Sequence, residues 1–316
     1  MVENRPTRTL VTGCCGFIAS HLSIGLGQLG HEVVGIDWMK GSEGRKKESL
    51  EILENMENFR FIKGDVAESL PKEEFDFVVH LAALPGVRAS IEKPFETFRC
   101  NAGVTAKVLD WAKEGYTNNL IYASSSSVYG LNQQIPFSEE DSLNSPNSPY
   151  AASKIATEVV ADTYCRLFPI KAVGLRFFTV YGPRGREDMA IHKFLTWVSN
   201  KTPVTVFGDG SSSRDYTFVE DIVSGIIASM NYASKSMQPH SHEVFNLGNN
   251  SPIKLSDLID LVGEIVGEEP IIDRQPDQLG DVPTTFANID KAVKLLRYQP
   301  KTNLSLGLRK TWESMN

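Results

Sequence analysis

Short apolar runs alternate with helical patterns through the first half of the chain. The predicted strands are almost continuous in Val, Ile, Leu and Phe, which is typical of parallel strands covered on both faces. They lie at 9–13, 32–37, 59–65, 75–83, 119–125 and 171–178. Helical patterns fall between them, most clearly at 17–29, 95–114 and 150–168. This alternation predicts an α/β fold with a doubly wound parallel (Rossmann) sheet, the architecture of nucleotide-binding domains.

The pattern changes after about residue 180. Gly, Pro and Ser accumulate in YGPRGRED, FGDGSSSRD and GNNSPIKLSD, and the elements between them are shorter. Residues 220–233 predict one more helix with an apolar face, and 243–248 one more buried strand. We therefore expect a Rossmann domain over 1–179, to which 217–249 returns. A smaller C-terminal domain over 180–316 would bind the substrate.

Composition narrows the class of protein. A net charge of −7 over 316 residues argues against general nucleic-acid affinity, which needs a basic face. No run of about 18 apolar residues predicts a membrane span, and the polar start MVENRPTRTL is unlike a signal peptide. The four cysteines, Cys14, Cys15, Cys100 and Cys165, fit neither a zinc spacing nor a disulfide framework. These features predict a cytoplasmic protein without a metal site.

A glycine turn follows the first predicted strand. Gly13 and Gly16 lie where the chain turns into a helix, whose N-terminal amides can bind a pyrophosphate. Asp37 ends the second strand, 24 residues after Gly13. A carboxylate at that point suits a free ribose 2′-hydroxyl and repels a 2′-phosphate. The turn therefore predicts a dinucleotide site with NAD preferred, while Lys46 and Lys47 downstream leave NADP as an alternative.

The stretch SPYAASKIATE places Tyr150 and Lys154 one helical turn apart. Side chains at i and i+4 lie on the same face of a helix and can meet. A nearby ammonium favours the phenolate and lowers the pKa of tyrosine from about 10. The pair therefore predicts a base for the hydroxyl of a sugar or another alcohol.

Five motifs occur together in a fixed order. They are TGCCGFIAS (12–20), GDV (64–66), HLAA (80–83), SSSSVYG (124–130) and YAASK (150–154). As a set they resemble the extended short-chain dehydrogenases/reductases that act on nucleotide sugars. The resemblance runs from about residue 8 to about residue 310. It implies the Rossmann fold, NAD as cofactor and a UDP-sugar as substrate. Members of this family pair helices corresponding to 95–114 and 150–168 into a dimer interface, so the resemblance also implies a homodimer.

The resemblance implies a role for each motif residue. The cofactor would be bound by Gly13, Gly16, Phe17 and Ile18 at the pyrophosphate, Asp37 at the adenosine ribose, Asp65 and Val66 at the adenine, and Leu81, Ala82 and Ala83 along the groove. The catalytic residues would be Tyr150, Lys154 and Ser125. Tyr150 would be the base, and Lys154 would bind the nicotinamide ribose and lower the tyrosine pKa. Ser125 would share the proton between the substrate oxygen and Tyr150.

The segment SSSSVYG narrows the reaction. Nucleotide-sugar 4,6-dehydratases carry an Asp-Glu pair there, and UDP-glucuronate decarboxylases carry Glu directly before the Val, where this chain has Ser127. The missing acids favour epimerisation at one carbon. In that reaction Tyr150 takes the proton of the sugar 4-hydroxyl, and the C4 hydride is transferred to NAD. The 4-keto sugar then turns over and receives the hydride on its other face.

The segment LRFFTVYGPRGREDMAIHKF (175–194) resembles the UDP-glucuronate 4-epimerases. Thr179 replaces an Asn that is common in UDP-glucose 4-epimerases, and Arg184 and Arg186 follow it closely. A guanidinium binds a carboxylate through two parallel hydrogen bonds, so this group suits a sugar with a C6 carboxylate. Glu187 stands where the family usually has Pro, and here the resemblance is weaker.

Two further segments resemble the substrate site of the family. In ALPGVRASIEKP (83–94), Arg88 matches the pattern, whereas Ala89 replaces an aromatic residue. Arg214 corresponds to the arginine that binds the diphosphate, and Asp281 to a residue near the uridine ribose. The full set of expected substrate residues is Arg88, Ser125, Ser126, Ser127, Tyr150, Thr179, Arg186, Thr205, Phe207, Arg214, Gln278 and Asp281.

The sequence therefore favours a UDP-glucuronate 4-epimerase that forms UDP-galacturonate. A UDP-glucose or UDP-N-acetylglucosamine 4-epimerase is the nearest alternative, followed by a UDP-glucuronate decarboxylase or a dehydratase. A non-catalytic NAD-sensing protein with the same fold is an alternative of another class. Relatives of that kind usually lose the Tyr or the Lys, and both are present here.

Overall fold

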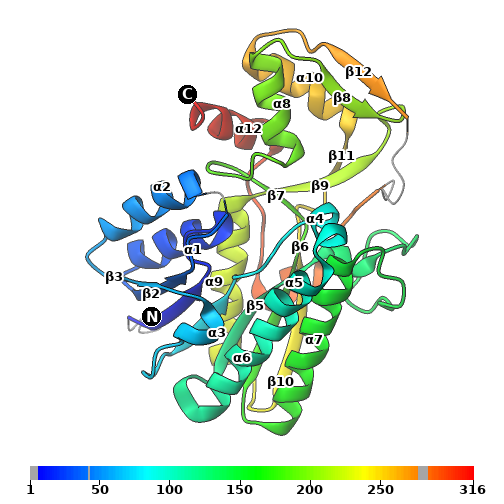
Figure 1. Cartoon of the computed structure of the whole chain (residues 1–316). Helices are drawn as coiled ribbons and strands as arrows, with labels where there is room; N and C mark the ends of the chain where they lie inside the picture. Colours follow the sequence, from blue (N-terminus) through cyan, green and yellow to red (C-terminus); the bar gives the residue numbers. More distant parts are fainter. Residues whose placement is uncertain (1–5, 42, 277–283) are drawn as a thin grey trace.

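The structure, a computed structural model, describes residues 6–41, 43–276 and 284–316. A parallel sheet of seven strands in the order β10-β6-β5-β4-β1-β2-β3 forms its centre (Figure 1). The strands are β1 (Arg8–Thr12), β2 (Glu32–Asp37), β3 (Phe59–Lys63), β4 (Phe77–His80), β5 (Asn119–Ser125), β6 (Lys171–Phe177) and β10 (Ser241–Leu247). This is the doubly wound α/β architecture that the sequence predicts.

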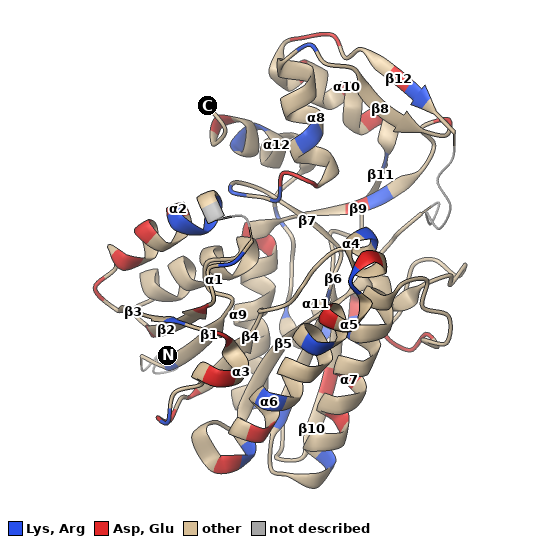
Figure 2. Ribbon diagram, viewed as in Figure 1, with Lys and Arg blue, Asp and Glu red and all other residues tan. Residues whose placement is uncertain are grey.

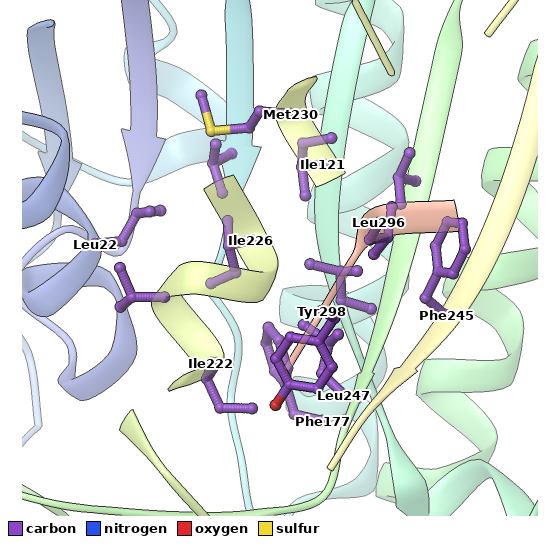
Figure 3. Packing of buried hydrophobic residues seen from close by; sticks show 14 of the residues in the cluster. Leu22, Ile121, Phe177, Ile222, Ile226, Met230, Phe245, Leu247, Leu296 and Tyr298 are labelled. Carbon is purple, nitrogen blue, oxygen red and sulfur yellow. The ribbon is translucent and has the colours of Figure 1, made fainter. Parts of the chain in front are cut away.

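Helices cover both faces of this sheet. Neighbouring residues of each strand point to opposite faces, so these apolar strands present apolar side chains on both sides. One face packs against α1 (Phe17–Gln28), α9 (Val219–Lys235) and α11 (Asp290–Leu296). Figure 3 shows Ile222, Ile226 and Met230 of α9 between Leu22 of α1 and residues of the strands. The other face packs against α6 (Val104–Trp111) and α7 (Pro149–Leu167). The sheet is therefore buried on both sides, as its apolar strands require.

The segment 217–249 contributes to this sheet. β10 pairs in parallel with β6, and α9 packs against α1, β5 and β6. The helix predicted at 220–233 and the strand predicted at 243–248 are therefore present. Both belong to the seven-stranded sheet and its covering helices. The boundaries between domains remain a prediction.

Residues after β6 also build a second, smaller lobe. It contains a three-stranded sheet, β11-β9-β7, and a two-stranded sheet, β12-β8. Its strands are β7 (Thr179–Tyr181), β8 (Val204–Phe207), β9 (Ser213–Phe218), β11 (Pro252–Lys254) and β12 (Ile272–Gln275). Its helices are α8 (Ala190–Ser199), α10 (Leu255–Val266) and α12 (Leu304–Glu313), and they enclose a separate apolar core.

Two predicted elements differ in detail. The strand predicted over 75–83 spans only Phe77–His80. Its pairing with β5 ends at His80, and the amide of Ala82 then donates to the side-chain Oγ1 of Thr12. The helix predicted over 95–114 is a helical run of several pieces. It consists of α5 (Pro94–Phe98), a π-helical segment (Arg99–Gly103), α6 and a second π-helical segment (Ala112–Tyr116). Short helices α2 (Glu43–Glu54), α3 (Val66–Ser69) and α4 (Val87–Glu92) complete the first lobe, together with a 3₁₀ turn at Ser126–Tyr129.

Candidate active site

A cavity of about 810 Å³ lies at the carboxyl ends of the parallel strands. Gly13 follows β1, Asp37 ends β2, Leu81 follows β4 and Ser125 ends β5, and all four line the cavity. The strand order of the sheet reverses between β1 and β4. Open α/β sheets bind ligands at such a point. The loop 182–189, which follows β7, also contributes to the lining. Both lobes therefore take part in one site.

Most of the predicted site residues meet in this cavity. The lining includes every residue predicted to bind the cofactor, namely Gly13, Gly16, Phe17, Ile18, Asp37, Asp65, Val66, Leu81, Ala82, Ala83, Tyr150 and Lys154. It also includes the predicted sugar-binding residues Ser125, Ser126, Ser127, Thr179 and Arg186. The structure thus brings these side chains together, while their individual roles remain predictions.

The glycine turn leaves room for a ligand at the start of α1. Gly13 has a φ of 70°, and a Cβ there would lie 2.9 Å from the Cα of Ala82. Gly16 is the N-cap of α1, and no side chain caps this helix. The first amides of a helix have no partner within the helix and favour an anion. The turn therefore fits the pyrophosphate of a dinucleotide.

Asp37 lies at the end of β2, beside the glycine turn, and is almost completely buried. Its carboxylate accepts hydrogen bonds from the amides of Met39 (2.8 Å) and Cys15 (3.3 Å). It also forms an ion pair with Nζ of Lys46, 2.7 Å away. Of the two lysines that leave NADP as an alternative, Lys46 is thus the partner of this carboxylate. Together the glycine turn and this carboxylate fit an adenosine ribose attached to a pyrophosphate.

The start of α7 positions Tyr150. Ser148 is the N-cap and accepts a hydrogen bond from the amide of Ala151 (3.1 Å), and Pro149 occupies the first turn. The amide of Tyr150, which the helix cannot satisfy, donates to Oγ of the buried Ser90 (3.1 Å). This bond fixes the first turn of α7 against α4.

Lys154 lies one turn later and is almost completely buried. Its Nζ donates to the carbonyl of Ala123 on β5 (2.8 Å) and lies 5.9 Å from the centre of the Tyr150 ring. Burial lowers the pKa of Lys154 to about 8, because the protein interior disfavours a charge, although the carboxylate of Glu158 acts in the opposite sense.

The pKa of Tyr150 differs from the sequence-based expectation. Burial raises this pKa, while a hydrogen bond with Ser125 and the charge of Arg186 lower it to a smaller extent. Lys154 directs its ammonium to a backbone carbonyl and not to the phenol. The expectation that Lys154 lowers the pKa of Tyr150 is therefore wrong for the chain by itself, because desolvation outweighs the charges nearby.

A buried polar network lies behind these residues and was missed by the sequence reasoning. Glu158 of α7 forms an ion pair with Arg176 of β6, with 2.8 Å between Oε2 and Nη2. Oε1 of Glu158 accepts from Oγ of Ser124 (2.5 Å) and Nε of Arg176 (3.0 Å). Nη1 of Arg176 donates to the hydroxyl of Tyr129 (2.9 Å). The only sequence signal was an acid one turn after Lys154 on a helix face that is otherwise buried.

Serine and threonine side chains place several hydroxyl groups in the cavity. Ser125 ends β5 and its Oγ accepts a hydrogen bond from the amide of Ser127 (3.2 Å), which fixes the 3₁₀ turn that follows. Ser126 and Ser127 lie in that turn and line the cavity, as does Thr179 at the start of β7. Several hydroxyl groups therefore lie within one cavity with the phenol of Tyr150.

Arg186 is held by a neighbour. Its Nε and Nη2 donate to the two carboxylate oxygens of Asp188, at 3.0 and 2.6 Å. The loop 182–189 is itself attached to the first lobe, because Nη1 of Arg45 donates to the carbonyl of Gly185 (2.6 Å). Glu187, the departure from the family pattern, lies 3.4 Å from Nε of Arg45. The sequence reasoning missed Arg45 and Asp188, which become visible only when the loop meets α2.

The remaining predicted substrate residues lie elsewhere. Arg88 is the second residue of α4, Thr205 and Phe207 lie on β8, and Arg214 lies on β9. None of these four residues lines the cavity. Gln278 and Asp281 lie outside the described residues. The roles of Arg214, Thr205, Phe207 and Asp281 at the uridine diphosphate stay predictions, as does the part of Arg88 and Gln278 in substrate binding.

Two histidines of the first lobe are buried in neutral form. The pKa of His21 is lowered to about 4 and that of His80 to about 3, in both cases mainly because of burial. Cys14 and Cys15 are free and buried in the glycine turn. In the part of the chain that the structure describes, no group of three or more His, Cys, Asp or Glu residues could hold a metal ion. None of the described helices is long and apolar enough to cross a membrane.

Comparisons with known proteins identify relatives. The model of the "NAD dependent epimerase/dehydratase family" matches residues 9–248. The UDP-glucuronate 4-epimerase of Thermodesulfobacterium geofontis is 35% identical over 318 residues, which cover 97% of this chain and 96% of that protein.

Solved structures resemble the whole chain. A UDP-glucuronic acid 4-epimerase from Bacillus cereus in complex with UDP-glucuronic acid and NAD has a TM-score of 0.89 at 35% identity, with 98% of each chain covered. A UDP-N-acetylglucosamine 4-epimerase from Methanobrevibacter ruminantium in complex with UDP-N-acetylmuramic acid has a TM-score of 0.88 at 26% identity, again with 98% of each chain covered.

Proposed function

This chain belongs to the NAD-dependent epimerase/dehydratase family, and we propose that it is a UDP-glucuronate 4-epimerase. It interconverts UDP-glucuronate and UDP-galacturonate through a transient 4-keto sugar, and NAD stays bound throughout. The observation that carries this proposal is the meeting of Tyr150 and Lys154 with Ser127, Thr179 and Arg186 in one cavity. A proton acceptor and groups suited to a carboxylate then face the same sugar.

The cofactor would be held by groups of the first lobe. The glycine turn would bind the pyrophosphate, Asp37 the adenosine ribose, and Asp65 with Val66 would flank the adenine. Asp65 is the N-cap of α3 and accepts from the amide of Ala67 (3.0 Å), which fixes its carboxylate at the cavity wall. When bound, NAD supplies a hydride acceptor and donor at C4 of the sugar and a positive charge beside Tyr150.

Tyr150 would take the proton of the sugar 4-hydroxyl, and Ser125 would hydrogen-bond the same oxygen. The burial that raises the pKa of the phenol must be offset before it can act as a base at neutral pH. Arg186 and the Ser125 hydroxyl already act in that direction, and Lys154 would add its charge while it binds the nicotinamide ribose. Return of the proton from Tyr150 to the alkoxide completes the cycle at either face of the sugar.

The C6 carboxylate would be bound by the hydroxyls of Ser126, Ser127 and Thr179 and by Arg186. Arginine is suited to this role because its planar head can donate two parallel hydrogen bonds to a carboxylate. In the structure Arg186 already binds Asp188 in that manner. The sugar carboxylate would therefore compete with Asp188 for the guanidinium.

The uridine diphosphate would extend toward the second lobe. Arg214 would pair with the diphosphate, and backbone groups at Thr205 and Phe207 would hold the uracil. Asp281 would lie near the uridine ribose, and Gln278 would also contact the substrate. Arg88 would act from the segment 83–94 beside the sugar. The family resemblance of the segments 83–94, 207–221 and 278–292 supports these roles.

A homodimer fits the exposed apolar side chains of the first lobe. Ile91 of α4, Phe95 of α5 and Val159 of α7 are all more than half exposed, and these three helices contact one another. Exposed apolar side chains on neighbouring helices are typical of an interface. Acidic and basic residues are interspersed over the molecule (Figure 2), which does not suit nucleic acid, and we expect the protein in the cytoplasm.

The leading alternative is a 4-epimerase of a neutral UDP-sugar. Glu187 and Ala89 leave it open, because both depart from the pattern of the UDP-glucuronate enzymes and weaken the resemblance there. A UDP-glucuronate decarboxylase is less well supported, since Ser127 replaces the acid that such enzymes carry.

Product analysis tests these possibilities. Purified protein is incubated separately with UDP-glucuronate, UDP-glucose and UDP-N-acetylglucosamine, and the products are separated by chromatography. In a parallel reaction the UDP-glucuronate carries deuterium at C4 of the sugar. Formation of UDP-galacturonate that retains this deuterium supports the proposal. Turnover of UDP-glucose alone, release of CO₂, or loss of the C4 deuterium to solvent would each contradict it. Tyr150→Phe serves as the inactive control.

A further inference from the structure

One acidic side chain lies on the catalytic face of α7 without a role in the chemistry proposed above. Tyr150, Lys154 and Glu158 follow one another at intervals of four residues, so they share one face of the helix. Glu158 is 6% exposed and Lys154 is 4% exposed. An ionised carboxylate is rarely buried to this extent unless it is paired, and here its partners are specific.

Three consecutive residues of β5 are held by these three side chains of α7. The carbonyl of Ala123 accepts from Nζ of Lys154, and Oγ of Ser124 donates to Glu158 at 2.5 Å. Ser125, the next residue, is the hydrogen-bond partner of Tyr150. The bonds made by Lys154 and Glu158 therefore determine how far along β5 the helix lies, and with it the distance between Tyr150 and Ser125.

The same carboxylate balances two buried cations. Arg176 donates to both oxygens of Glu158, and its own position is fixed by Tyr129, whose hydroxyl donates to Oδ1 of Asn246 (2.6 Å). Without Glu158, the cations of Lys154 and Arg176 would be buried together without an acidic partner. Like charges in a medium of low dielectric constant favour loss of the proton from the weaker base, which is the lysine.

We propose that Glu158 is a positioning residue for the reaction, which fixes α7 in register against the end of β5 and keeps Lys154 in its charged form. It acts through Ser124 and Lys154 and does not touch the sugar. This inference rests on the proposed function only for the choice of substrate in the assay.

Other charged groups around Lys154 do not take over this part. On β4, His80 has its pKa lowered to about 3 and is neutral at the pH of the reaction. On β6, Arg176 adds a positive charge, and in the loop 182–189 Arg186 is a further cation that acts on Tyr150. On α7 itself, burial raises the pKa of Tyr150, so its phenol carries no charge until a bound cofactor offsets that burial. Among the described residues, Glu158 is thus the acid whose charge favours the protonated form of Lys154.

The charge is tested by Glu158→Gln and Glu158→Asp. The glutamine retains a hydrogen-bond acceptor for Ser124 and removes the charge, whereas the aspartate retains the charge and is shorter. We expect Glu158→Gln to move the alkaline limb of the kcat profile, where Lys154 loses its proton, to lower pH by about one unit. Glu158→Asp should keep this limb within a few tenths of a pH unit and lower kcat through its altered geometry. A purely structural residue would lower kcat equally at every pH.

The register is tested by Ser124→Ala, a buried change that adds no charge and little strain. We expect kcat to fall about tenfold with KM and the pH profile almost unchanged, because one hydrogen bond between α7 and β5 is lost. Unchanged kcat in this variant would overturn the register part. If Glu158→Gln does not fold, Glu158→Asp and Ser124→Ala still decide the proposal. A shift of the alkaline limb to lower pH in Glu158→Asp, which keeps the charge, would contradict it.

A measurement without turnover separates this inference from the proposed function. The protein is labelled with ¹³C at the lysine ε-carbons, and the Lys154 resonance is assigned by its absence in Lys154→Met. Its titration midpoint should be lower in Glu158→Gln than in the wild type. An unchanged midpoint would overturn the role in keeping Lys154 charged. If the wild type converts no UDP-sugar, the proposed function fails, and this titration still gives a result for Glu158.

Discussion

Lys154 and Tyr150 face the same side of α7, yet the ammonium of Lys154 binds the carbonyl of Ala123 and lies 5.9 Å from the centre of the Tyr150 ring. The lysine therefore holds the helix to the sheet while it stays near the phenol. A ribose hydroxyl that accepts a hydrogen bond from Lys154 would lie between α7 and β5. It would thereby bring a bound ligand close to Tyr150.

Removal of the Tyr150 hydroxyl tests the base. Tyr150→Phe should lower kcat by about 10²–10⁴-fold, the usual contribution of a positioned acid or base. NAD should remain bound, because the pyrophosphate and adenosine sites are untouched. Steady-state rates and the cofactor content of the purified protein are the measurements. Tyr164→Phe is the matched control on the same helix, since its hydroxyl binds Asp110 outside the cavity. Comparable loss in both variants would contradict the role of Tyr150.

The arginine in the loop 182–189 tests the choice of an acidic sugar. Arg186→Ala should raise KM for UDP-glucuronate about tenfold or more and affect a neutral UDP-sugar much less. Asp188→Asn should lower KM for UDP-glucuronate a few-fold, because the competing carboxylate loses its charge. Arg166→Ala, an exposed change on α7, is the control. Equal effects of Arg186→Ala on both sugars would assign this arginine to the diphosphate or to the fold.

The ion pair of Asp37 and Lys46 tests the selectivity for the cofactor. Asp37→Asn should weaken retention of NAD and shift the preference toward NADP by about tenfold, because the free ammonium of Lys46 can then pair with a 2′-phosphate. The cofactors released on denaturation, and rebinding of each to the stripped protein, give the ratio. Asp260→Asn on α10 is an exposed control. Unaltered preference in Asp37→Asn would mean that the carboxylate does not face the ribose.

The glycine turn gives a prediction for stability. Gly13→Ala should lower the free energy of unfolding by roughly 3 kcal/mol and abolish NAD retention, since Gly13 has a φ of 70° and its Cβ would meet Ala82 at 2.9 Å. Gly30→Ala is the matched control. Gly30 also has a positive φ, of 82°, but no atom lies within 4 Å of the Cβ that this variant adds. It should cost about 1 kcal/mol and leave NAD binding intact. Chemical denaturation compares the two, and equal losses would contradict a close approach at Gly13.

His80 gives a prediction for acid stability. Its pKa is about 3 in the folded protein and about 6.5 in the unfolded chain, so the unfolded chain takes up the proton first as the pH falls. Its contribution is therefore fully present above pH 6.5 and is lost as the pH falls toward 3, on the order of 4 kcal/mol.

The free energy of unfolding is measured against pH for the wild type and His80→Gln. The variant should lose less stability between pH 6.5 and 4 than the wild type does. His240→Asn, at an exposed turn with positive φ, is the control and should follow the wild-type curve. The same pH dependence in His80→Gln and the wild type would contradict the buried neutral form of His80.

The sequence determined the elements, because apolar periodicity is a local property. The strands of the sheet, the helix over Pro149–Leu167 and the turn at Gly13 were all visible from spacing and residue type. The motif residues also fell into one cavity, because the carboxyl ends of parallel strands meet at one edge of a sheet. The predicted strand over 75–83 was too long, since an apolar run does not reveal where a chain leaves its neighbours.

Only the tertiary structure decided the electrostatics of the site, because a pKa depends on burial and on groups far away in sequence. The spacing of Tyr150 and Lys154 predicted a lowered tyrosine pKa, and burial reversed that direction. The partner of Lys46 is Asp37, that of Glu158 is Arg176, and that of Gly185 is Arg45. Each of these pairs joins separate elements, and no local pattern in the chain specifies which side chains meet there.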